Sequence, residues 1–341
     1  MIRLLSYFAG LAALSLCALA PARAQTIPVR VGVIPVIGAA PIFVANGEGW
    51  TKAAGLDLRF TTFESGPNMI QALASGTIDV YVGGVMPLAV ARSKGVGSKV
   101  VTATAIEEMV FVAAPKLAPA FTPGAAPADA FRQFRAKEGR PARLATQPAG
   151  SVPNTTLQHW LWQVVKADKA DIEIVPMGID ATQQAVLAGA VDGASIREPA
   201  LTIVQARDPR IKLVALGDEM FPEQPGTVVA VSDAFLAKNP DAVQNLVTAL
   251  VRATDLLKSD PARAAPYVEA ALGKGITDLS TIQKALASPA ARFVADPRAI
   301  VDATQKMQAY QVSIGTLDKE VPLDGLFEPR FFERAASAAP R

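Results

Sequence analysis

Residues 71–79 read Gln-Ala-Leu-Ala-Ser-Gly-Thr-Ile-Asp, and residues 184–192 read Gln-Ala-Val-Leu-Ala-Gly-Ala-Val-Asp. The two segments are identical or conservatively apolar at six of nine positions, and 113 positions separate Gly76 from Gly189. In each segment a helical pattern ends at a glycine, a residue that commonly ends helices, and a short apolar run follows. We infer that the chain contains two similar α/β units.

The residues around Gly76 predict the first unit. Pro41 favours the first turn of a helix, and Gly55 favours the end of that helix. The expected elements are strands over residues 29–34, 56–63 and 78–82 and helices over 41–54 and 66–76. This order is the βαβαβ unit of a parallel sheet with helices on its faces.

The same order recurs around Gly189. The expected elements are strands over residues 143–146, 171–176 and 191–196 and helices over 151–167 and 180–188. We therefore predict an α/β fold of two lobes, each a parallel-type sheet flanked by helices, with a hinge between them. The expected boundaries are 28–113 plus 224–341 for the first lobe and 114–223 for the second, with the C-terminal helices completing the first lobe.

The first 24 residues are expected to be a cleavable signal peptide. Arg3 precedes an apolar run over residues 4–20, and Ala22-Arg23-Ala24 fits the small-x-small cleavage pattern, which makes Gln25 the expected N-terminus. An uncleaved membrane anchor is one alternative, although a run of about 17 residues is short for a membrane span. A lipid anchor on Cys17 is another, although a leucine precedes it where such sites carry a small residue.

Charge and composition narrow the range of partners. The chain carries 33 Lys and Arg against 31 Asp and Glu, and loss of Arg3 and Arg23 with the signal would leave 31 of each. A nucleic-acid partner would require a basic field, so none is expected. Cleavage would also remove the one cysteine, and His159 is the one histidine, so we expect neither a metal nor a cofactor.

Signatures of catalysis are lacking as well. The sequence contains no HExxH, P-loop, GxSxG or dinucleotide glycine pattern. His159 lies in an expected helix, where a lone histidine is more often packed or solvated than chemical. Glu107-Glu108 is a carboxylate pair, but neighbouring strand residues face opposite ways, so we expect a solvated loop with at most one carboxylate reaching a cleft.

A series of short motifs resembles the substrate-binding proteins of ABC importers of the nitrate, taurine and aliphatic-sulfonate type, which are related to pyrimidine-precursor binders. The motifs are Ala40-Pro41-Ile42-Phe43-Val44-Ala45, Gly55-Leu56-Asp57-Leu58, Ser65-Gly66, residues 72–79, Gly83-Gly84-Val85-Met86-Pro87, residues 188–194 and Glu198-Pro199. They occur in the family's order over residues 29–235. The resemblance implies a two-lobe, hinge-closing fold and a role in uptake. Many members carry a bulky aromatic residue where this chain has Arg197, so no single member's ligand can be transferred.

Ligands of open α/β sheets lie beyond the carboxyl ends of the strands. This rule selects the loops at 36–40, 64–67 and 83–87 in the first lobe and at 147–154, 177–180 and 197–198 in the second. The candidate ligand-binding residues in them are Ile37, Gly38, Ala39, Glu64, Ser65, Gly66, Gly84, Val85, Ser151, Asn154, Arg197 and Glu198.

The expected helix starts favour an anionic ligand, because free N–H groups and partial positive charge lie at a helix N-terminus. Arg197 adds a planar guanidinium that suits a carboxylate or sulfonate, unless it pairs with Glu198 or a surface carboxylate. Glu64, if it points inward, would favour a ligand that also carries a donor or a cation. The ligand class therefore stays open.

These observations predict a monomeric periplasmic protein that is not an enzyme. It would capture a small anionic organic solute and deliver it to the permease and ATPase of an ABC importer. One alternative is a sensory protein that signals to a membrane receptor. A much weaker one is an enzyme that makes a thiamine pyrimidine precursor, because such chemistry would require histidine and cysteine residues that this chain largely lacks.

Overall fold

The computed structural model describes residues 26–272 and 277–338 of the 341-residue chain. The expected signal peptide, its cleavage site and Cys17 lie outside the described residues. Within those two ranges, no helix has both the length and the apolar character needed to cross a membrane. The same ranges hold no group of three His, Cys, Asp or Glu side chains placed to bind a metal ion.

Two five-stranded sheets form the framework. The first has the order β2-β1-β3-β11-β4, with strands Leu56–Thr62, Ile27–Val33, Val80–Gly84, Thr227–Ser232 and Ser98–Ala103. The second has the order β10-β6-β9-β7-β8, with strands Lys212–Ala215, Val110–Ala113, Gly193–Ile196, Ala142–Thr146 and Ile172–Pro176. Each sheet contains one strand, β11 or β6, that runs antiparallel to both neighbours, while the other four are mutually parallel. The expected parallel sheets are therefore each interrupted by one reversed strand.

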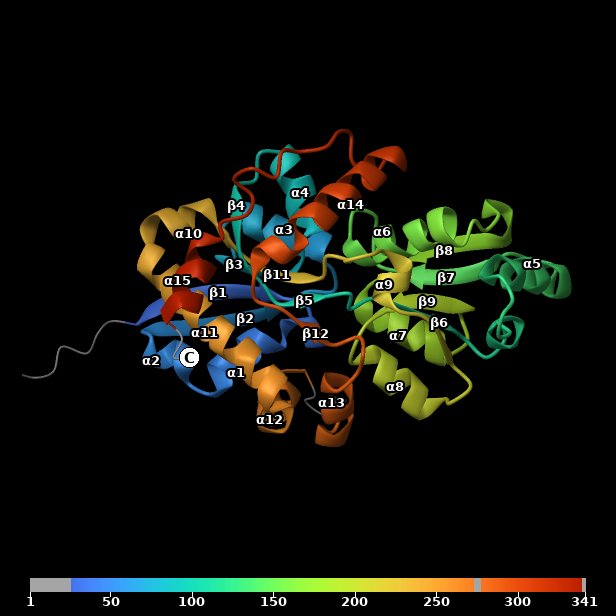
Figure 1. The fold of residues 1–341 in the computed structure, drawn as a ribbon, viewed down its shortest axis with the longest axis horizontal. Helices are drawn as coiled ribbons and strands as arrows, with labels where there is room; N and C mark the ends of the chain where they lie inside the picture. Colours follow the sequence, from blue (N-terminus) through green and yellow to red (C-terminus); the bar gives the residue numbers. More distant parts are fainter. Residues whose placement is uncertain (1–25, 273–276, 339–341) are drawn as a thin grey trace, which may run out of the picture.

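Helices pack around both sheets, and Figure 1 shows the two lobes side by side. In the first lobe they are α1 (Ala40–Gly47), α2 (Trp50–Ala53), α3 (Gly66–Ala74) and α4 (Met86–Ser93). In the second they are α5 (Pro127–Glu138), α6 (Val152–His159), α7 (Ile179–Leu187), α8 (Ala200–Arg207) and α9 (Gly217–Met220). The C-terminal part adds α10 (Asp233–Lys238), α11 (Pro240–Ser259), α12 (Pro261–Leu272), α13 (Leu279–Leu286), α14 (Val301–Ser313) and α15 (Arg330–Ala338).

The internal repeat extends over seven elements in each lobe. The series β1-α1-β2-α3-β3-α4-β4 corresponds to β7-α6-β8-α7-β9-α8-β10, and the two series occupy the same relative positions in their sheets. Asp79 and Asp192, 113 positions apart, make the same contacts. The Asp79 N–H donates to the carbonyl of Arg30 at 2.8 Å, and its carboxylate accepts from the Arg30 N–H at 3.0 Å. Asp192 repeats both bonds with Arg143, each at 2.8 Å.

The chain passes between the lobes twice. β4 ends at Ala103 and β6 begins at Val110, so the first passage lies within 104–109, and the return lies within 216–226. The boundary at 113 expected from the sequence therefore falls too late, because β6 pairs with β9 and β10 of the second sheet. Two short strands, β5 (Ala105–Ile106) and β12 (Arg292–Phe293), pair with each other beside the first passage.

Two expected helices are shorter in the structure. The helix expected over 41–54 is divided into α1 and α2, because Gly49 adopts a left-handed φ of 76° that interrupts the helix. The helix expected over 151–167 ends as α6 at His159 and continues as a π-helical turn over Trp160–Val164.

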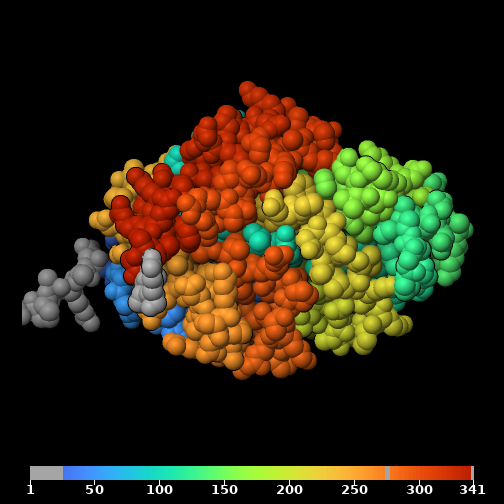
Figure 2. Space-filling model, in the orientation of Figure 1, coloured from blue at the N-terminus to red at the C-terminus, as the bar shows by residue number. Residues whose placement is uncertain are grey.

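The C-terminal helices pack on the first lobe and also reach the second. Val243 and Leu246 of α11 and Phe331 of α15 share one hydrophobic core with the first sheet. Figure 2 shows the C-terminal part covering one face of the first lobe and reaching the second. From α14, the buried Gln311 Nε2 donates to Thr155 Oγ1 of α6 at 2.8 Å. The lobes are therefore joined by this contact as well as by the two passages.

Candidate ligand-binding site between the lobes

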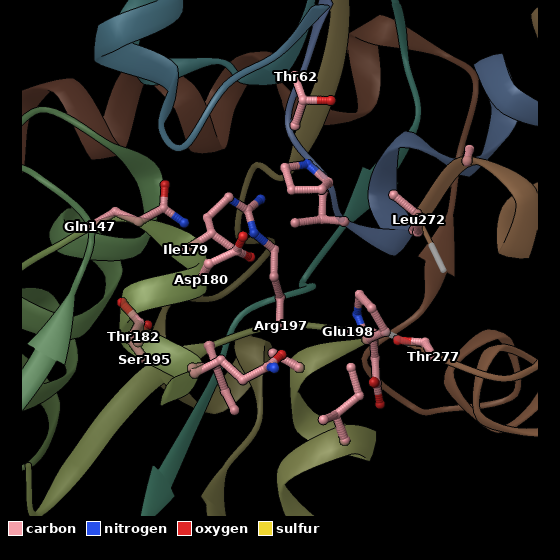
Figure 3. A pocket seen from close by; sticks show the side chains of 18 residues that line it. Thr62, Gln147, Ile179, Asp180, Thr182, Ser195, Arg197, Glu198, Leu272 and Thr277 are labelled. Atoms are coloured by element: carbon pink, nitrogen blue, oxygen red, sulfur yellow. The ribbon is translucent and has the colours of Figure 1, made fainter. Parts of the chain in front are cut away.

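A cavity of about 270 Å³ lies between the lobes (Figure 3). Pro35 and Val36 follow β1, Thr62 ends β2, and Gln147 and Arg197 follow β7 and β9, so the cavity occupies the carboxyl edges of both sheets. This is the edge where ligands of open α/β sheets lie. The described lining residues are Pro35, Val36, Thr62, Gln147, Ile179, Asp180, Thr182, Gln183, Ser195, Ile196, Arg197, Glu198, Pro199, Ala200, Ile203, Ala271, Leu272 and Thr277.

Arg197 lies in this wall with only 4% of its surface exposed. Its Nη1 donates to Glu108 Oε1 at 2.7 Å, and the same oxygen accepts a 2.7 Å hydrogen bond from Thr227 Oγ1 of β11. The Glu108 carboxylate, in the first passage, thus joins the end of β9 to the start of β11. Of the alternatives open for Arg197, the ion pair is present, but its partner is Glu108 rather than Glu198 or a surface carboxylate.

The expected solvated position of Glu107-Glu108 is wrong. Glu107 is 8% and Glu108 2% exposed, and they pair with different arginines, Glu107 with Arg292 and Glu108 with Arg197. Glu107 has a left-handed φ of 51°, so the alternation of an extended strand does not apply at this position. Both carboxylates therefore point into the protein. Each is paired with a guanidinium, which compensates the cost of burying its charge.

Unpartnered polar atoms gather in the second lobe's wall. Arg197 Nε, Ser195 Oγ and Thr146 Oγ1 are buried and have no hydrogen-bond partner among the described residues. Ser195 lies on β9, and the register of β9 with β7 places Thr146 beside it on the next strand. Buried polar groups normally find partners. These donors can therefore serve an acceptor group of a bound molecule, and Ser195 and Arg197 line the cavity directly.

The wall also contains the carboxylate of Glu198, whose surface is 2% exposed. Its carboxylate accepts hydrogen bonds from Thr202 N at 3.1 Å and Thr202 Oγ1 at 3.0 Å. Burial raises the pKa of Glu198 above its usual value, and hydrogen bonds from Ser288 and Thr202 act in the opposite direction. Its carbonyl accepts from the N–H of Ile37 at 2.9 Å, which is a contact between the two lobes.

Two of the twelve sequence-predicted residues, Arg197 and Glu198, line the cavity. Glu64 contacts its rim, because Glu64 Oε2 accepts from the N–H of the lining residue Asp180 at 3.2 Å. Ile37, Ala39 and Val85 are buried, while Gly38 packs so closely on Glu108 and Thr227 that an added Cβ would lie 2.7 Å from Thr227 Oγ1. The absence of a side chain at Gly38 therefore leaves room for Glu108 and Thr227.

The remaining five predicted residues organise the helices and strands behind the wall. Ser65 caps α3 by accepting from Asn68 N, and Ser151 caps α6 by accepting from Asn154 N. Gly66 packs against Tyr81, Gly84 packs against Val152, and Asn154 Oδ1 accepts from Gln158 Nε2 at 2.7 Å. Direct ligand contact by these residues stays a prediction.

Several lining residues lie outside the twelve. Gln147, Ile179 and Asp180 belong to loops that the strand-end rule had selected. Ala271, Leu272 and Thr277 come from the C-terminal part, and no local signal in the sequence links them to the cleft. His159 lies elsewhere, with Nδ1 at 2.9 Å from the Met220 carbonyl and its ring packed on Phe221 and Tyr310; burial lowers its pKa.

A comparison with known protein families identifies the family of this chain. The profile of the NMT1-like family matches residues 22–272, which is most of the chain. The protein belongs to the NMT1-like family. The family assignment confirms the family resemblance that the sequence motifs had indicated.

Individual relatives of this NMT1-like protein are distant. A Brucella abortus protein described as a candidate binding protein is 24% identical over 245 residues, 70% of each chain. The periplasmic nitrate-binding protein of Synechocystis PCC 6803 superposes with a TM-score of 0.78 at 13% identity, covering 92% of this chain and 89% of that one. The ligand-binding component of an ABC-type import system from Staphylococcus aureus gives a TM-score of 0.72 at 16% identity, covering 90% and 98%. These likenesses confirm the two-lobe periplasmic binding protein fold.

Proposed function

We propose that this NMT1-like protein is the solute-binding component of an ABC importer, which captures a small organic solute between its lobes and delivers it to a permease coupled to an ATPase. The observation that carries the proposal is the cavity of about 270 Å³ bounded by the strand ends of both lobes. Two proteins of the same fold, the nitrate-binding protein of Synechocystis PCC 6803 and the ligand-binding component of an ABC-type import system from Staphylococcus aureus, are binding proteins. Among the described lining residues there is no histidine, cysteine or lysine, which favours binding over catalysis.

The solute would carry an acceptor group, such as a carboxylate or sulfonate, directed at Arg197 and Ser195. Arg197 Nε and Ser195 Oγ are the unpartnered donors of the wall, and a hydrogen bond from a guanidinium to an anion is stronger than a neutral one. Glu108 already shares the charge of Arg197, and Asp180 lines the same cavity. We therefore expect a single anionic group on a solute that also carries a hydrogen-bond donor, rather than a polyanion.

The proposed location is the periplasm. Cleavage after Ala24 would release a chain that begins at Gln25, and N-terminal sequencing of protein recovered from the periplasm would identify that residue. The protein would act as a monomer, because one chain supplies both walls of the cavity.

Native mass spectrometry of freshly purified protein tests the proposal. A bound solute would appear as a mass difference that disappears on denaturation, and calorimetric titration with that solute would give its affinity. Ser195→Ala removes a donor that would bind the anionic group of the solute and should weaken binding about 10-fold. The exposed Ser93→Ala on α4 is the matched control and should bind like the parent. Equal affinities for both variants would place the binding site elsewhere.

A further inference from the structure

Helix α7 begins without a cap from its own lobe. Its N-cap is Gly178, which has no side chain to accept a hydrogen bond from the first turn. The equivalent helix of the first lobe, α3, is capped by Ser65, whose hydroxyl accepts from Asn68 N. Ser65 and Gly178 are 113 positions apart and occupy the same place in the repeat. The N-cap residue of α7 therefore supplies no side-chain acceptor, whereas the N-cap residue of α3 does.

The first lobe also supplies the acceptor for α7. Glu64 follows β2, and its carbonyl accepts from the N–H of Ile179 at 3.3 Å. Its carboxylate Oε2 accepts from the N–H of Asp180 at 3.2 Å. A carboxylate is the favoured partner for the N–H groups and partial positive charge of a helix N-terminus. An added Cβ on Gly178 would lie 2.9 Å from Glu64 Oε2, so the glycine leaves room for this contact.

This contact lies at the rim of the cavity. Thr62, two residues before Glu64, lines the cavity from the first lobe, and Ile179 and Asp180 line it from the second. In Figure 3, Thr62 lies at the top of the view, and Ile179 and Asp180 lie below it. Separation of the lobes across the cavity would break both hydrogen bonds, whereas neither depends on a bound solute.

We propose that Glu64 is an interlobe latch, a positioning residue that stabilises the closed form by capping α7 from the opposite lobe. The inference rests on the proposed function, because it requires lobes that open and close. A contact made only in the closed form shifts the equilibrium toward that form. A solute that binds the closed form then gains apparent affinity in proportion to the closed fraction, although Glu64 need not touch it.

The test measures closure without any solute. Gln71→Cys on α3 and Gln184→Cys on α7 are exposed, equivalent positions of the two lobes, and a Cys17→Ser background leaves them as the only thiols. Spin labels at both positions report the distance between the lobes by pulsed electron resonance. Two distance populations are expected in the parent, and their ratio gives the closed-to-open equilibrium.

Three variants separate a latch from a simple helix cap. Glu64→Ala should lower the closed-to-open ratio about 5-fold, the usual effect of losing an N-cap acceptor. Glu64→Gln, whose amide oxygen still accepts, should lie between this variant and the parent. Glu64→Ala/Gly178→Ser gives α7 a serine cap of its own, as in α3, and should recover thermal stability while the ratio stays low. Asp57→Ala, which removes an exposed carboxylate on β2, is the matched control.

Each outcome has one meaning. A low ratio in Glu64→Ala that persists in the double variant supports the latch. Recovery of the ratio in the double variant would overturn it, because Glu64 would then act only through the stability of α7. An unchanged ratio in Glu64→Ala, with two populations in the parent, would also overturn the latch and leave the hinge intact. A single unchanging distance in the parent would overturn the hinge and the latch together.

Discussion

Arg197 lies in the cavity wall, yet one of its nitrogen atoms is already held by Glu108. Both side chains are almost fully buried, and Thr227 contributes a third member from β11. Two charges withdrawn from water are tolerated here because each compensates the other. The group that looked from the sequence like a ligand contact therefore also fastens the lobes to the segments that connect them.

Removal of Arg197 should consequently lower the stability of the fold itself, in addition to any effect on ligand binding. Arg197→Ala leaves the Glu108 carboxylate buried without its guanidinium, which should lower the free energy of unfolding by about 3 kcal/mol or more. Arg197→Ala/Glu108→Gln should recover part of this loss, because no charge is then buried, and urea denaturation at pH 7 measures each variant. Arg210→Ala removes an exposed ion pair with Asp208 and should leave the midpoint unchanged. Parent-like stability of Arg197→Ala would show that the pair is not formed in solution.

Glu198 should make stability depend on pH. Burial raises the pKa of its carboxyl above the usual 4.5, so the folded protein holds this proton more tightly than the unfolded chain. Its stabilising effect is present at low pH and is lost as pH rises through the folded pKa. Relative to Glu198→Gln, the parent should thus lose free energy of unfolding as pH rises above 4.5. A difference between the two proteins that stays constant with pH would contradict this cause.

Residue types and spacing identified Arg197 and Glu198 as cleft residues but not their partners. Glu108 is 89 positions from Arg197, and only the folded topology brings them together. The interpretation of Glu107-Glu108 failed for a local reason, since it assumed an extended strand where the chain takes a left-handed turn. Side-chain contacts between residues so far apart in the sequence depend on tertiary packing, which sequence periodicity does not reveal.

At the scale of elements, the repeat was the most informative signal. It correctly predicted three strands and the intervening helices in each lobe, because a helix, a glycine and an apolar strand leave a strong local pattern. β4, β6, β10 and β11 left a weaker one. β6 and β10 have only four residues each, and β6 and β11 are antiparallel to their neighbours, so only distant pairing defines the roles of these strands.

The two helix-ending glycines should be equally sensitive to substitution. Gly76 and Gly189 have φ values of 69° and 65°, and an added Cβ would meet no atom within 4 Å at either. Alanine there should cost about 1 kcal/mol in the free energy of unfolding, through backbone strain alone, and asparagine less. Thermal or urea unfolding of Gly76→Ala and Gly189→Ala should give matching losses. No loss at either site would show that the backbone is not left-handed there.

At the scale of the whole molecule, three of the hydrogen-bonded contacts among the described residues link the two lobes. They join Glu64 to α7, Ile37 to Glu198, and Gln311 to Thr155. The structure thus represents the lobes close together, and rigid-body opening would break the contacts nearest the cavity while leaving both sheets intact.

Small-angle X-ray scattering should detect that opening. The solute-free protein should have a larger radius of gyration than the structure predicts, and saturation with its solute should reduce the radius to the structure's value. Mature protein at several concentrations provides the control, because association would also enlarge the radius. An identical radius with and without saturating solute would contradict closure of the cleft.

The two passages between the lobes also set an order of assembly. Strands β1 to β4 leave the ribosome first, but β4 has no strand neighbour, and β3 only one, until Thr227–Ser232 has been synthesised. All five strands of the second sheet lie within 110–215 and emerge before then. The half of the protein that is translated first is therefore the half that is finished last. During that interval its unpaired strand edges are exposed to pairing with other chains, which is a route to aggregation.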